Sequence, residues 1–232
     1  MAMPYYVSPE QLMQDKAEFA KKGISRGRAT VVMRTTDGVL FVAHNPGSAL
    51  NKISEIYDRI GFAGAGRFSE FESLRKAGIR HADVTGYSYS REDVTAKSLA
   101  NGYSHMLGEV FAHEVKPMEV ELVVAEVGAS PENDTIYRVS FDGNIIGEGD
   151  YAVVGGDADR VRVALDRDFS RVADVRASLS LCREVLGSSG AGAGANGRLS
   201  AADFEVALLD RALRGRTFRR LSTTEVAALL PA

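Results

Sequence analysis

The sequence predicts an α+β fold in which two antiparallel sheets stack face to face between outer layers of helices, a four-layer α-β-β-α sandwich. Four short strands come before the first helix with a substantial apolar face, so strands and helices do not alternate one by one as in a parallel sheet. A pair of helices, a group of strands, another pair of helices and a last strand then follow. Two sheets, each covered by one helix pair, would bury every apolar face in this order.

The composition is that of a globular protein, and we interpret residues 1–232 as a single domain. Apolar residues make up 45% of the chain, charged residues 25%, and the net charge of −3 gives no general attraction to nucleic acid. No apolar run is long enough to span a bilayer, and a single cysteine excludes an internal disulfide framework. We therefore expect a cytoplasmic protein with no nucleic-acid or membrane partner.

The first predicted element is an N-terminal helix over residues 9–22. Ser8 can cap it, Pro9 suits its first turn, and Gly23 is expected to end it. Its apolar stripe is thin because Lys16 interrupts it. We therefore expect this helix to lie across other elements or another subunit rather than to fill a core.

Two strands are predicted over residues 29–36 and 39–44. Asp37-Gly38 lies between them, and Asp-Gly between apolar runs is a strong signal for a tight hairpin. The stretch 51–66 then adds two more short strands. Their turn is expected at Asp58-Arg59.

The stretch 51–66 is the one around which the chain is organised. Lys52 enters its first strand, its second strand ends in alternating glycines, and a helix opens at Arg67. The glycines have the order G-x-x-G-x-G and are Gly61, Gly64 and Gly66. This order is the reverse of the dinucleotide fingerprint, and no Gly-Lys-Ser/Thr follows as in a phosphate-binding loop. We therefore expect a tightly packed strand-to-helix junction rather than a phosphate site.

Two helices are predicted next. The first runs from Arg67 to Gly78, residues 79–89 form a connection, and the second helix runs from Ser90 to a point before Pro117. Strands are then expected; they cover residues 119–127, 135–141 and 151–154.

The last third of the chain is predicted to begin with a helix capped by Asp157. A second amphipathic helix covers residues 172–186 and carries Cys182 within its apolar stripe, so that Cys182 is expected to be a core thiol. Residues 187–197 are a low-complexity run of Gly, Ser, Ala and Asn and are expected to form a flexible loop.

Three shorter segments complete the chain. Residues 204–209 fit a strand or a helix, and a strand is preferred. Residues 214–220 are a basic run, interpreted as a solvated face rather than a docking site for an acidic partner. Residues 222–225 read Ser-Thr-Thr-Glu, a capping box for a short final helix.

Motifs for metal, cofactor or hydrolytic chemistry are weak. His105, Glu109 and His113 follow one helix face, but a single face does not easily wrap three ligands around one ion. No G-x-S-x-G nucleophile elbow occurs. We expect no metal, no cofactor and no catalytic residue.

A four-layer sandwich with an early hairpin also describes the N-terminal-nucleophile hydrolases, in which a processed Thr, Ser or Cys acts through its own free amine. Such a nucleophile heads the first strand, where this sequence reads Gly-Arg-Ala-Thr at 27–30. Thr30 lies inside the predicted strand, no Gly-Thr junction precedes it, and the helix over 9–22 comes before it. The alternative of an active threonine-type hydrolase therefore has the scaffold but lacks its nucleophile.

Several motifs in combination are more specific. They are Pro-Tyr-Tyr-Val-Ser-Pro-Glu-Gln at 4–11, Lys-Lys-Gly-Ile-Ser-Arg at 21–26, Gly-Val-Leu-Phe-Val-Ala at 38–43, Lys-Ile-Ser-Glu-Ile-Tyr-Asp-Arg-Ile-Gly-Phe-Ala at 52–63 and Lys-Pro-Met-Glu-Val-Glu-Leu at 116–122. With these motifs the chain resembles an actinobacterial-type proteasome core particle α subunit over nearly its whole length.

The resemblance implies a non-catalytic role. Seven α subunits would form each outer ring of a barrel, and β subunits in the inner rings would hold the threonine nucleophiles. The helix over 9–22 would cross the top of the ring. Residues 1–8 would close the entry pore to unfolded protein substrates; the gate residues are Tyr5, Tyr6, Ser8 and Pro9.

The resemblance also implies a docking pocket between adjacent α subunits, into which a hexameric ATPase inserts its C-terminal tails. Lys52 and Gly66 match the lysine and glycine of that pocket in spacing. Lys52 would pair with the terminal carboxylate of the tail, and Gly66 would let the tail approach. Arg67 stands where related chains often carry an apolar residue and is a candidate second carboxylate contact. The substrates in this pathway carry a small protein tag.

Overall fold

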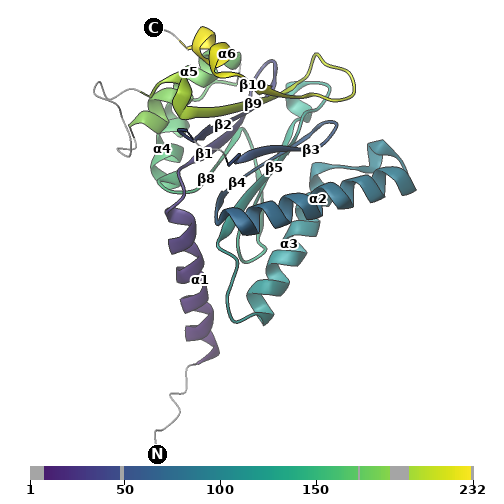
Figure 1. Cartoon of the computed structure of the whole chain (residues 1–232), viewed down its shortest axis with the longest axis vertical. Coiled ribbons are helices and arrows are strands. Elements are labelled where there is room, and N and C mark those ends of the chain that lie inside the picture. The colour runs from purple at the N-terminus through teal and green to yellow at the C-terminus, as the bar shows by residue number, and fades with distance from the viewer. Residues whose placement is uncertain (1–7, 48–49, 172, 189–198, 231–232) are drawn as a thin grey trace, which may run out of the picture.

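A computed structural model describes residues 8–47, 50–171, 173–188 and 199–230. Two five-stranded antiparallel sheets form its centre (Figure 1). The first sheet has the order β10-β9-β2-β1-β8, with strands Thr30–Arg34 (β1), Gly38–His44 (β2), Tyr151–Val154 (β8), Phe204–Asp210 (β9) and Phe218–Leu221 (β10). The second has the order β3-β4-β5-β6-β7, with strands Ile53–Tyr57 (β3), Ile60–Gly66 (β4), Val120–Glu126 (β5), Thr135–Val139 (β6) and Ile145–Glu148 (β7).

The helices cover the outer faces of the two sheets, so the predicted α-β-β-α sandwich with an extra N-terminal helix is confirmed. They are α1 (Pro9–Ser25), α2 (Phe68–Ser88), α3 (Ala96–His113), α4 (Ala158–Asp168), α5 (Val175–Gly187) and α6 (Thr223–Leu229). Three short 3-10 helices lie between them: η1 (Arg91–Asp93), η2 (Pro131–Asn133) and η3 (Ala201–Asp203). Among the described residues, no helix is both long and apolar enough to cross a membrane.

Three apolar clusters hold the four layers together. The central cluster lies between the sheets, where Phe41 and Val32 of one sheet pack with Ile53 and Val123 of the other. A second cluster joins the first sheet to α4, α5 and α6, and a third joins the second sheet to α2 and α3. Each sheet therefore buries both faces, which is why β2 is buried along its whole length.

Helix α1 projects from the sandwich, and its N-terminal end lies farthest out (Figure 1). It continues through Gly23 to Ser25, so the predicted end at Gly23 is wrong. A Cβ on Gly23 would lie 2.2 Å from Oε2 of Glu119, which packs against the helix at this point. Gly23 thus allows a close side-chain contact and does not end the helix.

Lys16 lies on the buried face of α1 instead of interrupting an apolar stripe. The buried residues of this helix are Lys16, Ala20 and Ile24. The Lys16 stem crosses the apolar surface, and its Nζ donates to the backbone oxygen of Phe111 at 3.1 Å. Leu12 and Phe19 of the same helix are each 47% exposed in the described chain.

The β1–β2 hairpin turns one residue earlier than predicted. The backbone groups of Thr35 and Gly38 bond to each other, at 2.8 Å from the Thr35 N–H and 3.4 Å from the Gly38 N–H. Thr36 and Asp37 therefore form the tip, and Gly38 follows with φ +148°. At Gly38 a Cβ would lie 1.9 Å from a backbone oxygen, so glycine is required there.

Helix α2 runs without a break through Gly78, so the predicted end at Gly78 and the connection over 79–89 are wrong. A Cβ on Gly78 would lie 1.7 Å from the hydroxyl of Tyr103 in α3. The glycine therefore lets the two helices approach each other. The helix ends at Ser88, ten residues later than predicted.

The start of α3 also differs from the prediction. Residues 91–93 form η1, and α3 begins only at Ala96, where Oγ1 of Thr95 accepts the Ser98 N–H at 3.2 Å. The predicted start at Ser90 is therefore wrong. Ser90 caps the short η1 instead.

The second half of the chain contains two strands that the sequence does not predict. β7 has only four residues, and β10 overlaps the end of the basic run 214–220. The charge of this run is balanced by the chain's own acids: Arg219 lies 3.1 Å from Asp210, and Arg220 pairs with Glu205. The edge strand β10 was therefore missed because its sequence is rich in basic residues.

Some of the helix caps and strands predicted in this half of the chain are confirmed, and one predicted cap is wrong. Asp157 precedes α4 but has φ +60° and makes no side-chain capping bond, so its predicted role is wrong. Asp174 caps α5 instead, through the Ala177 N–H at 2.8 Å. The strand preferred over 204–209 is confirmed as β9, and the capping box of Ser222 and Glu225 before α6 is confirmed.

Cys182 is fully buried in α5, which confirms the prediction of a core thiol. Burial raises the pKa of this thiol to about 12. Gly187 is the last residue of α5, and the remainder of the predicted loop beyond Ser188 lies outside the described residues.

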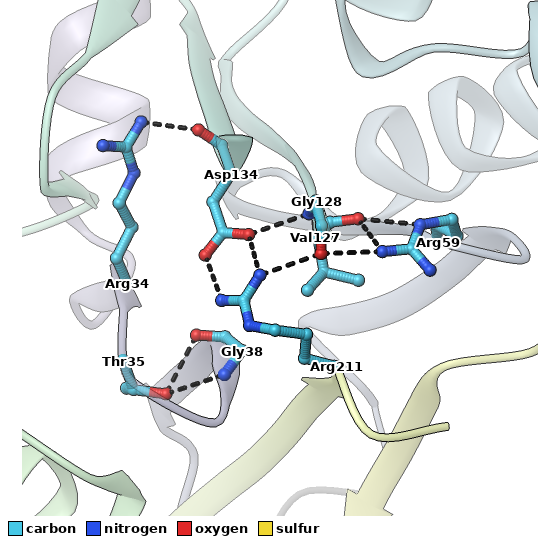
Figure 2. A network of polar contacts seen from close by, with 8 residues as sticks. All are labelled: Arg34, Thr35, Gly38, Arg59, Val127, Gly128, Asp134 and Arg211. Atoms are coloured by element: carbon cyan, nitrogen blue, oxygen red, sulfur yellow. Dashed lines mark hydrogen bonds and ion pairs between the residues drawn. The ribbon is translucent and has the colours of Figure 1, made fainter. Parts of the chain in front are cut away.

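A polar network closes the end of the sandwich at which the β1–β2 turn lies (Figure 2). We call it the Asp134 network; its charged members are Arg34, Arg59, Asp134 and Arg211. Asp134, fully buried, lies 2.8 Å from the Arg211 guanidinium and accepts the Gly128 N–H at 2.8 Å. Arg211 follows β9 in one sheet, and Asp134 precedes β6 in the other, so the pair connects the two sheets.

Candidate functional site

Lys52 lies at the opposite end of the sandwich, directly before β3. Its side chain is half-buried, and its Nζ donates to the backbone oxygen of Arg28 at 2.9 Å. Burial and the Arg28 charge lower the pKa of Lys52 to about 8, although the Glu205 carboxylate acts in the opposite direction. An ammonium group that has lost part of its water is a good partner for a carboxylate.

Glu205 fixes the backbone at Lys52 from the other sheet. Its carboxylate accepts the Lys52 N–H at 2.8 Å and the Ile53 N–H at 3.1 Å, and it also pairs with Arg220. Glu205 belongs to β9, far from Lys52 in sequence. The position of Lys52 is thus decided by contacts between the two sheets.

Gly66 ends β4 with φ +115°, a conformation that L side chains rarely adopt. A Cβ there would lie 1.9 Å from the backbone oxygen of Glu119, which accepts the Arg67 N–H at 2.8 Å. Gly64 is also tight, because a Cβ would lie 2.8 Å from the Phe71 ring. The expected tightly packed junction is therefore present.

Arg67 lies before the first residue of α2 and is surrounded by charged side chains. Its guanidinium is 3.6 Å from Glu119 and 3.9 Å from Glu70. Lys116 Nζ lies 2.9 Å from Glu70 and 3.0 Å from Glu119. The cations of Arg67 and Lys116 and the carboxylates of Glu70 and Glu119 thus form a network of ion pairs beside Gly66.

The three predicted pocket residues lie in two cavities that share a wall. The Lys52 cavity, of about 150 Å³, is lined by Lys52, Leu50, Gly66 and Phe71 among others. A larger cavity of about 620 Å³, which we call the basic cavity, contains Arg67. Its lining consists of Phe19, Lys22, Gly23, Arg26, Gly27, Gly66, Arg67, Lys116 and Glu119.

Gly27 and Gly66 line both cavities, so the structure brings Gly66 next to Lys52 and also next to Arg67. The sequence reasoning missed Gly27, Arg26 and Lys22. A signal for them exists, because four basic residues and two glycines fall within residues 21–28.

Two of the four predicted gate residues lie outside the described part of the chain. Tyr5 and Tyr6 are not described, whereas Ser8 caps α1 through the Gln11 N–H at 3.2 Å and Pro9 is its first residue.

His105, Glu109 and His113 follow the outer face of α3, with Glu109 3.9 Å from His105 and 3.5 Å from His113. The described residues contain no group of three side chains placed to hold a metal ion.

Thr30, the position tested as a nucleophile, is fully buried within β1 and pairs with Ala43 and Val154. Residues 26–29 connect it to α1, whose Ala20 and Ile24 belong to the central core. The described chain therefore continues from α1 into β1, and the Thr30 side chain is not exposed.

Comparison with known proteins gives a consistent result. Residues 24–201 match the family model described as Proteasome subunit. The chain is 52% identical over 231 residues to "Proteasome subunit alpha" of Saccharopolyspora erythraea, covering 100% of this chain and 89% of that protein. It is 53% identical over 233 residues to the protein of the same name from Kineococcus radiotolerans, covering 99% of this chain and 98% of that protein.

A four-layer sandwich with a packed glycine junction and no exposed nucleophile at β1 fits this match. The chain therefore belongs to the proteasome subunit family. Within the family it is of the actinobacterial α type, since a third relative, "Proteasome subunit alpha" of Actinosynnema mirum, is 52% identical over 232 residues, 99% of this chain and 88% of its own length.

Proposed function

We propose that the chain is a non-catalytic subunit of a cytoplasmic proteasome core particle. Seven copies would form each outer ring and stack on a ring of β subunits, which supply the catalytic threonines. The names of its relatives and the buried position of Thr30 support this proposal. The exposed apolar side of α1, with Leu12 and Phe19, is available for contact with neighbouring subunits.

The pocket at Lys52 is proposed to receive the C-terminal tails of a hexameric ATPase, which delivers proteins carrying a small tag. One observation carries this proposal: a half-buried ammonium that is held by a backbone oxygen beside a cavity. The terminal carboxylate of a tail would pair with Lys52, a charge-assisted contact worth roughly 1.5–3 kcal/mol. Gly66 lines the same cavity, so the backbone of the tail would pass beside it.

The segment 1–8 is proposed to gate entry of unfolded protein into the barrel. It precedes α1, and the N-terminal end of α1 lies far from the sandwich (Figure 1). Tyr5 and Tyr6 would contribute the bulk of the gate, and Pro9 would fix the direction in which the segment leaves the helix.

The docking proposal is tested by Lys52→Ala in the particle assembled with its β partner. The variant should form rings normally but lose stimulation of peptide hydrolysis by a cognate ATPase. Lys97→Ala, which removes an exposed lysine on α3, is the matched control and should retain stimulation. Full stimulation of the Lys52→Ala particle would refute the pocket.

The gate proposal is tested by deleting residues 2–8, which should raise basal peptide hydrolysis by the assembled particle. An unchanged rate would remove the proposed gate. The non-catalytic proposal is tested on the chain alone, which should keep its full mass of 25.0 kDa and hydrolyse no peptide. Loss of the residues before a threonine, together with hydrolysis, would instead support the threonine-type hydrolase.

A further inference from the structure

The basic cavity contains more positive charge than its own acids neutralise. Arg67 and Lys116 are balanced by Glu70 and Glu119, each of which lies within 4 Å of both cations. Glu70 is further committed, because it accepts the Glu119 N–H at 2.6 Å. These two carboxylates therefore have little capacity for additional cations.

Two further cations face the same cavity without a carboxylate partner. Lys22 and Arg26 line it from the C-terminal end of α1, and both are exposed. Neither forms an ion pair with any residue that the structure describes. A helix C-terminus carries partial negative charge, which favours cations there but satisfies them only weakly. The cavity thus has two cations available for a ligand.

The same cavity is contiguous with the proposed docking pocket. Gly27 and Gly66 lie between the basic cavity and the Lys52 cavity and line both. Neither glycine projects a side chain between them. A single extended peptide could therefore place its terminal carboxylate at Lys52 and earlier residues near Lys22 and Arg26.

We propose that the basic cavity binds acidic side chains of the same tail, upstream of the terminal carboxylate that Lys52 receives. This inference rests on the proposed docking function and adds to it the chemistry of the partner: an Asp or Glu side chain that pairs with Lys22 and Arg26. Charge complementarity carries the choice, because two unpaired cations favour a carboxylate-bearing peptide and disfavour a basic one. The contact would select among tails that all end in a free carboxylate.

The test uses soluble random octapeptides, one pool with a free C-terminal carboxylate and one amidated, applied to the particle assembled with its β partner. We expect retention of the free-acid pool and enrichment of Asp or Glu upstream of the last residues. The best-retained peptide is then compared with its Asp→Asn or Glu→Gln form, which should bind roughly tenfold more weakly at low salt. The difference should shrink as ionic strength rises.

The matched variants are Lys22→Ala/Arg26→Ala and the control Lys97→Ala/Arg160→Ala, which removes the same charge from exposed positions on α3 and α4. The first should lose the preference for acidic residues while still retaining free-acid peptides, and the control should keep the preference. Equal binding of the acidic peptide and its Asp→Asn or Glu→Gln form would overturn the inference but leave Lys52 docking intact. Equal retention of amidated peptides, or retention of none, would overturn the docking function and the inference together.

Discussion

The two ends of the sandwich use charged residues in opposite ways. In the Asp134 network, a fully buried carboxylate and an Arg211 side chain that is only 14% exposed pair at 2.8 Å. Neighbouring backbone oxygens take up the other guanidinium groups: Arg34 donates to Asp134 O at 2.6 Å and Arg59 to Gly128 O at 2.9 Å (Figure 2). At the other end, the Lys52 side chain donates to the Arg28 carbonyl, and two cations of the basic cavity have no carboxylate partner among the described residues.

The difference separates charge that holds the fold from charge that is available for binding. Breaking a buried ion pair strongly destabilises the fold, because removing one partner leaves the other charge buried without a counter-charge. The charge of a half-buried lysine with a lowered pKa instead destabilises the folded protein before any ligand binds. Four changes test this contrast, from the largest expected effect to the smallest.

Asp134→Ala should destabilise the protein by about 3–5 kcal/mol, because Arg211 would remain largely buried without a carboxylate. Urea unfolding at one fixed protein concentration measures this loss. Asp168→Ala removes a carboxylate from the exposed pair with Arg167 and should leave the unfolding midpoint unchanged. A similar small effect for both variants would remove the distinction between the two ends.

Gly66→Ala should cost about 2–4 kcal/mol, because the new Cβ meets the Glu119 carbonyl and the residue must keep a positive φ. Gly102→Ala is the control, since a Cβ on this α3 glycine has open space around it. Alanine favours the helix, so the control should unfold no more easily than the parent. Equal stability of Gly66→Ala and parent in urea would refute the strained junction.

Lys52→Met should stabilise the protein at pH 7 by something on the order of 1 kcal/mol, because it removes a partly desolvated cation. The pKa of Lys52 is about 8 in the folded chain, below the usual value of 10.5. The folded state therefore pays for the charge fully below pH 8, and this penalty fades as pH rises from 8 toward 10.5. Urea unfolding at pH 7 and pH 10 should show the gain at pH 7 and little at pH 10. A gain that did not depend on pH would mean that the charge is not its cause.

Lys22→Ala/Arg26→Ala should change stability least, within about 0.5 kcal/mol, because both side chains are exposed and unpaired within the described chain. Thermal unfolding of parent and variant should give overlapping curves. A clear loss would show that these cations support α1, and would place them with the structural charges of the molecule.

Some local signals in the sequence predicted the structure well. The Ser222 and Glu225 capping box, the glycine junction that ends at Gly66 and the buried Cys182 all follow from neighbours within one turn or one strand. The sequence motifs, through the family resemblance, also predicted that Lys52 and Gly66 line one pocket. They did not indicate that Arg67 lies in a different cavity from Lys52, or that Gly27 belongs to both.

Three of the failures share one physical cause. Gly23 and Gly78 look like helix ends, but each is a place where a distant side chain, Glu119 or Tyr103, comes closer to the helix than a Cβ would permit. Lys16 looks like a break in an apolar stripe, but the Phe111 carbonyl satisfies it. In each case a partner far away in the sequence decides what the residue does.

The sequence by itself determined the four layers and most of their strands and helices, because apolar periodicity and turn residues act over a few neighbours, and its motifs indicated the family. Only the tertiary structure decided where Lys52 lies, since Glu205 of the other sheet holds its backbone. It also decided which cations are available for binding, because ion pairing depends on the approach of segments that no local pattern brings together.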